Sequence, residues 1–129
     1  MNDLVDQARD ARLHAYAPYS HFAVGAALRA SSGRVYLGVN VENASYPAGI
    51  CAERSALVAA VTAGERHFEA IAVVTDTPAP TSPCGVCRQM LAEFGLELRV
   101  TLATLSGQQV EMSLGELLPR AFVPESLVR

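Results

Sequence analysis

The spacing of apolar residues changes period several times along the chain, and each change marks an expected element. Apolar positions within 3–15 fall on one helical face, and Pro18 follows, so an opening helix is predicted there. The other runs, bounded by turn residues and by Gly64 and Gly95, predict strands over 22–30, 35–41, 68–75, 96–105 and 109–112 and helices over 51–63, 84–94 and 113–118. This order predicts a mixed sheet of about five strands covered by helices, an α/β fold.

Composition narrows the class of protein. A chain of 129 residues is expected to form one domain, 1–129, and its 50% apolar content favours a homo-oligomer that buries apolar surface between subunits. The net charge of −3 and the lack of any basic cluster argue against a nucleic-acid partner. No apolar run is long enough to span a membrane, and no signal peptide is visible. Three cysteines, an odd number, favour reduced thiols and a cytoplasmic location.

The candidate chemistry lies in two short cysteine motifs. Cys84 and Cys87 are three residues apart, so both thiols face one side of a first helical turn, and Cys51 opens another predicted helix. Three thiolates hold zinc and leave a fourth position open for water, which is the arrangement of a catalytic site. Glu53, two residues after Cys51, is close enough to carry that water's proton. The motifs therefore predict zinc-dependent hydrolytic deamination.

The sequence leaves other roles open for the three cysteines. A structural zinc site needs a fourth ligand, but His14, His21 and His67 all lie outside the two motifs. A thioredoxin-like dithiol at 84–87 leaves the Cys51 motif unexplained. Buried apolar cysteines do not account for the placement of all three at helix starts. A zinc module without activity is a further alternative.

The chain resembles a cytidine deaminase of the small, homotetrameric, zinc-dependent type. The matching segments are Tyr16-Ala17-Pro18-Tyr19-Ser20, Phe22-Ala23-Val24-Gly25-Ala26-Ala27-Leu28, Gly38-Val39-Asn40-Val41-Glu42-Asn43-Ala44, Cys51-Ala52-Glu53-Arg54, Ser82-Pro83-Cys84-Gly85-Val86-Cys87-Arg88-Gln89 and Glu116-Leu117-Leu118-Pro119. The resemblance runs nearly end to end. It implies a single three-layer domain, one Zn²⁺ per chain, and conversion of cytidine and 2′-deoxycytidine to uridine, 2′-deoxyuridine and ammonia in pyrimidine salvage.

The resemblance also implies roles at the site, with Glu53 as the proton carrier. Arg54 is expected to hydrogen-bond the sulfurs of the metal ligands. Asn40 and Glu42 alternate near the end of a predicted strand, so both side chains point the same way, and the resemblance assigns them to the ribose hydroxyl. The residues expected to contact the rest of the nucleoside are Phe22 on the base, the Ala52 N–H at the pyrimidine O2, and Tyr46 and Phe122 in a neighbouring subunit's site.

Other deaminases of the same superfamily are alternatives to a cytidine deaminase. A blasticidin-type deaminase has similar zinc motifs, but the carboxylate of Glu42 is not expected there. Deaminases of tRNA or DNA usually have a histidine in place of Cys51 and need a basic path for the strand. Arg120 stands where relatives often have a small residue, which puts the details of the Phe122 contact in doubt.

Overall fold

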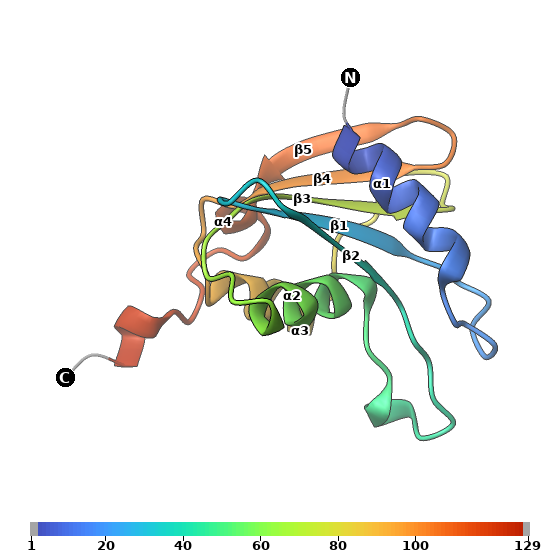
Figure 1. The fold of residues 1–129 in the computed structure, drawn as a ribbon, viewed down its shortest axis with the longest axis horizontal. Coiled ribbons are helices and arrows are strands. Elements are labelled where there is room, and N and C mark those ends of the chain that lie inside the picture. Colours follow the sequence, from blue (N-terminus) through green and yellow to red (C-terminus); the bar gives the residue numbers. More distant parts are fainter. Residues whose placement is uncertain (1–2, 128–129) are drawn as a thin grey trace.

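The computed structural model describes residues 3–127, which form one five-stranded sheet with helices on both faces (Figure 1). The helices are α1 (Asp3–Ala11), α2 (Ala52–Thr62), α3 (Gly85–Ala92) and α4 (Leu114–Leu117), and the strands are β1 (Gly25–Ala30), β2 (Val35–Val39), β3 (Phe68–Thr75), β4 (Arg99–Thr104) and β5 (Gln109–Ser113). The sheet order is β2-β1-β3-β4-β5. Among the strand pairs of this sheet, within residues 3–127, only β3–β4 is parallel. Its two strands are connected through α3, because parallel neighbours need a crossover. The predicted α/β fold with a mixed sheet is confirmed.

Two apolar clusters divide the core between the faces of the sheet. On one face, α1 packs through Leu4, Val5 and Ala8 onto the small residues Ala27 and Ala72 of the central strands. On the other face, α2 and α3 lie side by side over a larger cluster that includes Leu28, Leu57, Ile71, Leu91 and Val100. Successive residues of β1 and β3 alternate between these clusters, as strand geometry requires. The result is three layers, with α2 and α3 on the same side.

Several predicted boundaries are wrong by a few residues. The opening helix is α-helical only to Ala11 and ends in a 3-10 turn over Arg12–His14. The first strand begins at Gly25, because the backbone of 22–24 bonds side chains from elsewhere instead of another strand. The second strand ends at Val39, and the fourth begins at Arg99. Further 3-10 turns at Tyr46–Ala48 and Pro124–Leu127 were not anticipated.

Other local predictions are confirmed. The strand expected over 68–75 is β3, and Ser113 caps α4 through a capping box with Glu116. Within residues 3–127, the structure has no helix that is long and apolar enough to cross a membrane.

Candidate active site

The N-termini of α2 and α3 converge and bring the two cysteine motifs together. Cys51 is the N-cap of α2, Cys84 is the N-cap of α3, and Cys87 lies in the first turn of α3. The Sγ atoms of Cys51 and Cys84 are 3.8 Å apart, those of Cys84 and Cys87 are 3.3 Å apart, and all three lie within 4.8 Å of one another. The three thiols predicted from sequence therefore form one cluster.

The cluster fits a zinc ion. With Zn–S bonds of about 2.3 Å, tetrahedral ligands place their sulfurs roughly 3.8 Å apart, which is the Cys51–Cys84 separation. The positive ends of two helix dipoles point at the thiols and favour their ionised form. The neighbouring Cys87 thiol lowers the pKa of Cys51 to about 5, and Arg54 acts in the same direction. No fourth His, Cys, Asp or Glu joins the three cysteines among the residues that the structure describes.

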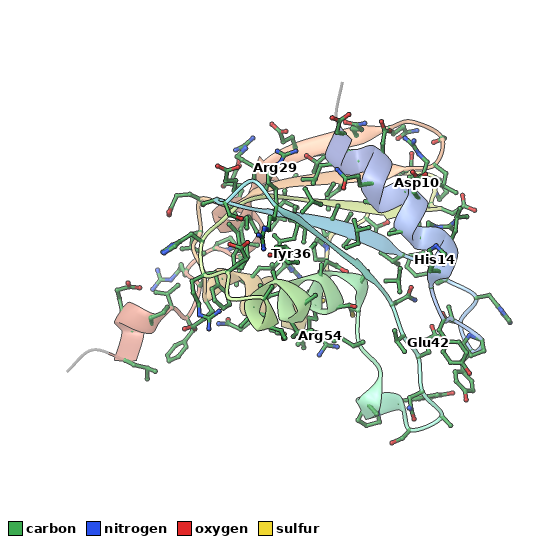
Figure 2. All side chains as sticks on the ribbon, viewed as in Figure 1. Asp10, His14, Arg29, Tyr36, Glu42 and Arg54 are labelled. Carbon is green, nitrogen blue, oxygen red and sulfur yellow. The ribbon has the colours of Figure 1, made fainter. Side chains whose placement is uncertain are left out.

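Arg54 lies on the first turn of α2 (Figure 2), and its guanidinium reaches the cysteine cluster. Its Nη2 atom is 4.0 Å from Cys51 Sγ and 3.4 Å from the carbonyl oxygen of Gly49, and its buried Nε has no partner among residues 3–127. Burial opposes the charge, but the combined interactions with the Cys51 and Cys87 sulfurs outweigh it and raise the pKa of Arg54. A fixed positive charge therefore faces the sulfur cluster.

Glu53 is the buried acid of the site. Only 5% of its surface is exposed, and burial raises the pKa of its carboxyl to about 7. Glu53 lines the same cavity as Cys51 and Cys84, a space of about 430 Å³. This volume is in the range of small-molecule sites. A carboxyl that exchanges protons near neutral pH thus lies against an open pocket beside the thiols.

The cavity also collects most of the predicted substrate-binding residues. Phe22, Asn40, Glu42, Tyr46 and Ala52 all line it. Figure 2 shows Glu42 on the extension that follows β2. This extension is fixed to the cysteine motif, because Val41 and Ile50 exchange two backbone hydrogen bonds of 3.0 Å each. Asn40 and Glu42 are thereby held close to Cys51.

Phe122 is the one predicted substrate-binding residue that the structure does not bring to this cavity. Phe122 is 57% exposed on the C-terminal segment, and its carbonyl accepts a 2.8 Å hydrogen bond from Gln89 Nε2 on α3. Arg88 Nη1, also on α3, donates to the carbonyl of Leu117 at the end of α4, just before this segment. Arg120, the residue noted above, has a left-handed backbone with φ of 56°.

Sequence reasoning missed several residues of the site. The remaining lining includes Val24 just before β1, Val73 and Thr75 of β3, and Thr81 and Ser82 of the loop between β3 and α3. Ser20 was noted only as part of a matching segment, yet its hydroxyl donates to Glu42. No spacing rule joins Ser20 to Glu42, because their contact depends on how two separate loops fold together.

A family model decides the classification. The model described as "Cytidine and deoxycytidylate deaminase zinc-binding region" matches residues 1–103. The chain belongs to this family. Among similar proteins, the "Cytidine deaminase" of Sporosarcina psychrophila is 49% identical over 96% of this chain and 92% of its own. The "Cytidine deaminase" of Mycobacterium tuberculosis is 41% identical over 99% of this chain and 93% of its own length.

Solved structures agree with the family assignment. The crystal structure of cytidine deaminase from Burkholderia pseudomallei superposes with a TM-score of 0.91 at 50% identity, covering 95% of this chain and all of that one. The crystal structure of cytidine deaminase from Mycobacterium tuberculosis gives a TM-score of 0.82 at 42% identity, and the match covers 94% of this chain and 95% of that one. Both family and fold therefore match the resemblance stated from sequence.

Proposed function

We propose that this chain catalyses the zinc-dependent hydrolytic deamination of cytidine and 2′-deoxycytidine to uridine and 2′-deoxyuridine plus ammonia. The observation that carries the proposal is the buried Glu53 carboxyl in the same cavity as a three-thiol cluster. A structural zinc module needs neither the cavity nor the acid. The relatives described above are named cytidine deaminases, which gives no support to a blasticidin-type activity.

Each residue of the site has a defined task in this reaction. Cys51, Cys84 and Cys87 would hold one zinc ion, which supplies Lewis acidity and an open position at which water becomes a nucleophile near neutral pH. Arg54 offsets the negative charge of the thiolates. Glu53 accepts a proton from water and delivers it to N3 of the pyrimidine. The water oxygen bonds to C4. Glu53, ionised again, then takes the remaining proton from the C4 hydroxyl and passes it to the amino group, so that the C4–N4 bond breaks, ammonia leaves and the C4 oxygen becomes a carbonyl.

The remaining residues would bind and orient the nucleoside. Phe22 contacts the base and the Ala52 N–H donates to the pyrimidine O2. Asn40 and Glu42 bind the ribose hydroxyl, and the ionised Glu42 suits a hydroxyl donor because hydrogen bonds from Ser20 lower the pKa of its carboxyl.

The assembly and setting extend the same proposal. The whole chain, 1–129, acts as one catalytic domain in a cytoplasmic homotetramer that serves pyrimidine salvage on free nucleosides. Tyr46 and Phe122 are proposed to enter a neighbouring subunit's site. The 77% exposure of Tyr46 and the outward position of Phe122 support this assignment, because both apolar rings are left uncovered in one chain.

The test is the loss of cytidine absorbance on conversion to uridine, with bound zinc quantified. Wild type should turn over cytidine, while Glu53→Gln should keep zinc and lose at least ~10²–10⁴-fold in kcat, the usual contribution of a positioned acid–base group. Glu116→Gln, which changes a capping-box glutamate outside the cavity, is the matched control and should keep its kcat. Zinc-loaded wild type that turns over neither nucleoside would refute the proposal.

A further inference from the structure

Glu42 is held in place by the loop that precedes β1. Its Oε1 atom accepts the backbone N–H groups of Tyr19 at 2.9 Å and Ser20 at 3.1 Å, and its Oε2 atom accepts the Ser20 hydroxyl. Three donors from two consecutive residues therefore fix both oxygens of the carboxylate. The orientation in which Glu42 meets a substrate is set by this loop and not by β2 alone.

The same Ser20 hydroxyl also holds Phe22. Ser20 Oγ accepts the Phe22 N–H at 3.0 Å, and the Phe22 carbonyl accepts Asn40 Nδ2 at 2.7 Å. Phe22 is thus bonded on both sides of its backbone, by Ser20 and by Asn40. A hydroxyl has one proton to donate and two lone pairs to accept, so Ser20 can satisfy Glu42 and Phe22 at once.

The backbone between Ser20 and Phe22 needs this support. His21 has φ of 58°, in the left-handed region that non-glycine residues rarely adopt. Such a conformation persists only where surrounding contacts over-determine it. Here the contacts include the two bonds of the Ser20 hydroxyl, the bond from the Ser20 N–H to Glu42, and a 3.0 Å hydrogen bond from the His21 N–H to the Ala17 carbonyl. Removal of the Ser20 hydroxyl deletes two of these bonds together.

We propose that Ser20 is a positioning residue that couples recognition of the sugar hydroxyl by Glu42 to placement of the Phe22 ring against the base. The inference rests on the proposed function, because it takes Glu42 and Phe22 as the sugar and base contacts. Without the Ser20 hydroxyl, Glu42 Oε2 loses its hydrogen bond and the Phe22 N–H is left without a partner. The preference of the site for a nucleoside that carries the sugar hydroxyl should therefore fall.

The chain contains a matched control at the β1–β2 turn. Ser32 Oγ donates to Glu65 Oε2 at 2.7 Å and accepts the Arg34 N–H at 3.3 Å. This is the same pattern of a hydroxyl that bonds a distant carboxylate and the N–H two residues later. Ser32 and Glu65 do not line the cavity. Ser32→Ala therefore removes equivalent bonds without touching the site.

The experiment compares wild type with Ser20→Ala, Ser20→Thr and Ser32→Ala, all zinc-loaded. The readouts are kcat and KM for cytidine and for 2′,3′-dideoxycytidine, together with the melting temperature. Ser20→Ala should lose about 10-fold or more in kcat/KM for cytidine, the scale of a lost hydrogen bond to a charged group, mainly through KM. It should lose much less with the dideoxy substrate. Ser20→Thr should restore the preference, and Ser32→Ala should keep it.

Equilibrium binding separates this inference from the proposed reaction. Calorimetry with uridine and 2′,3′-dideoxyuridine measures the hydroxyl preference without turnover, and Ser20→Ala should reduce that preference to a similar degree. The inference is overturned if Ser20→Ala keeps the wild-type preference, or if Ser32→Ala lowers it equally. A wild type that binds uridine with a Ser20-dependent preference but deaminates nothing would refute the reaction and leave the role of Ser20 standing.

Discussion

The close approach of β2 to α2 at Gly38 leads to a prediction that joins packing to catalysis. A Cβ atom at Gly38 would lie 2.3 Å from the Ala52 carbonyl oxygen and 2.4 Å from the Ala56 N atom. Both are backbone atoms of α2, so no side-chain rotation can relieve the clash. Ordinary contact begins near 3.4 Å. Gly38→Ala therefore requires α2 to move away from the sheet by about 1 Å.

This displacement should affect both stability and rate. Overpacking of a filled interior costs about 1–3 kcal/mol, which lowers the melting temperature of a chain of this size by roughly 4–12 °C. Ala52 and Glu53 lie on the turn of α2 that has to move. A misplacement of about 1 Å can cost ~10²-fold in rate, so kcat/KM for cytidine should fall by about that factor while zinc stays bound.

The assay measures thermal unfolding, zinc content and kcat/KM for three glycine variants. Gly25→Ala clashes at 2.0 Å with the Ala8 carbonyl, so it should lower stability by displacing α1, which carries no site residue. Gly115→Ala meets only ordinary contacts of 3.5 Å or more, so it should leave the melting temperature and kcat/KM unchanged. The reasoning is refuted if Gly38→Ala melts and reacts like wild type. It is also refuted if Gly25→Ala loses as much kcat/KM as Gly38→Ala.

Two further predictions concern the loops. Because His21 has a left-handed backbone, His21→Gly should be tolerated, whereas the β-branched His21→Val should lower the free energy of unfolding by more than about 1 kcal/mol in urea titrations; equal stability of the two variants would contradict this. Hydrogen bonds from Ser32 and Tyr36 lower the pKa of Glu65 below 4.5. The contribution of the ionised Glu65 to the free energy of unfolding is therefore complete above pH 4.5 and is lost as the pH falls through the lowered pKa. The stability difference between wild type and Glu65→Gln should shrink on going from pH 7 to about pH 4, and a constant difference would count against it.

The sequence was most informative where chemistry and local structure coincide. Cys51 and Cys84 were predicted at helix starts, and each is an N-cap, because loop-to-helix transitions are visible in short-range composition. The first strand was misjudged because Phe22-Ala23-Val24 is as apolar as the strand it precedes. Its backbone groups are instead taken by the Asn40 amide and by Arg12, whose Nε donates to the Ala23 carbonyl at 2.8 Å. Such long-range partners leave no period in the sequence.

Under the proposed function, the residues for reaction and those for recognition lie on separate parts of the fold, and backbone hydrogen bonds fix the distance between them. The cysteines and Glu53 stand on helix N-termini packed against one face of the sheet, whereas Asn40 and Glu42 lie on the extension beyond β2. The extension is bonded on one side to Tyr16, through Tyr16 N–H to the Asn40 carbonyl and Glu42 N–H to the Tyr16 carbonyl, and on the other side to Ile50, next to Cys51. A backbone ladder of this kind resists displacement better than side-chain contacts do, because each bond constrains the next. Substitutions in the loop that precedes β1 and holds Glu42 should consequently alter which nucleoside is preferred. Substitutions at sheet positions packed against α2, such as Gly38, should instead alter how fast any nucleoside reacts.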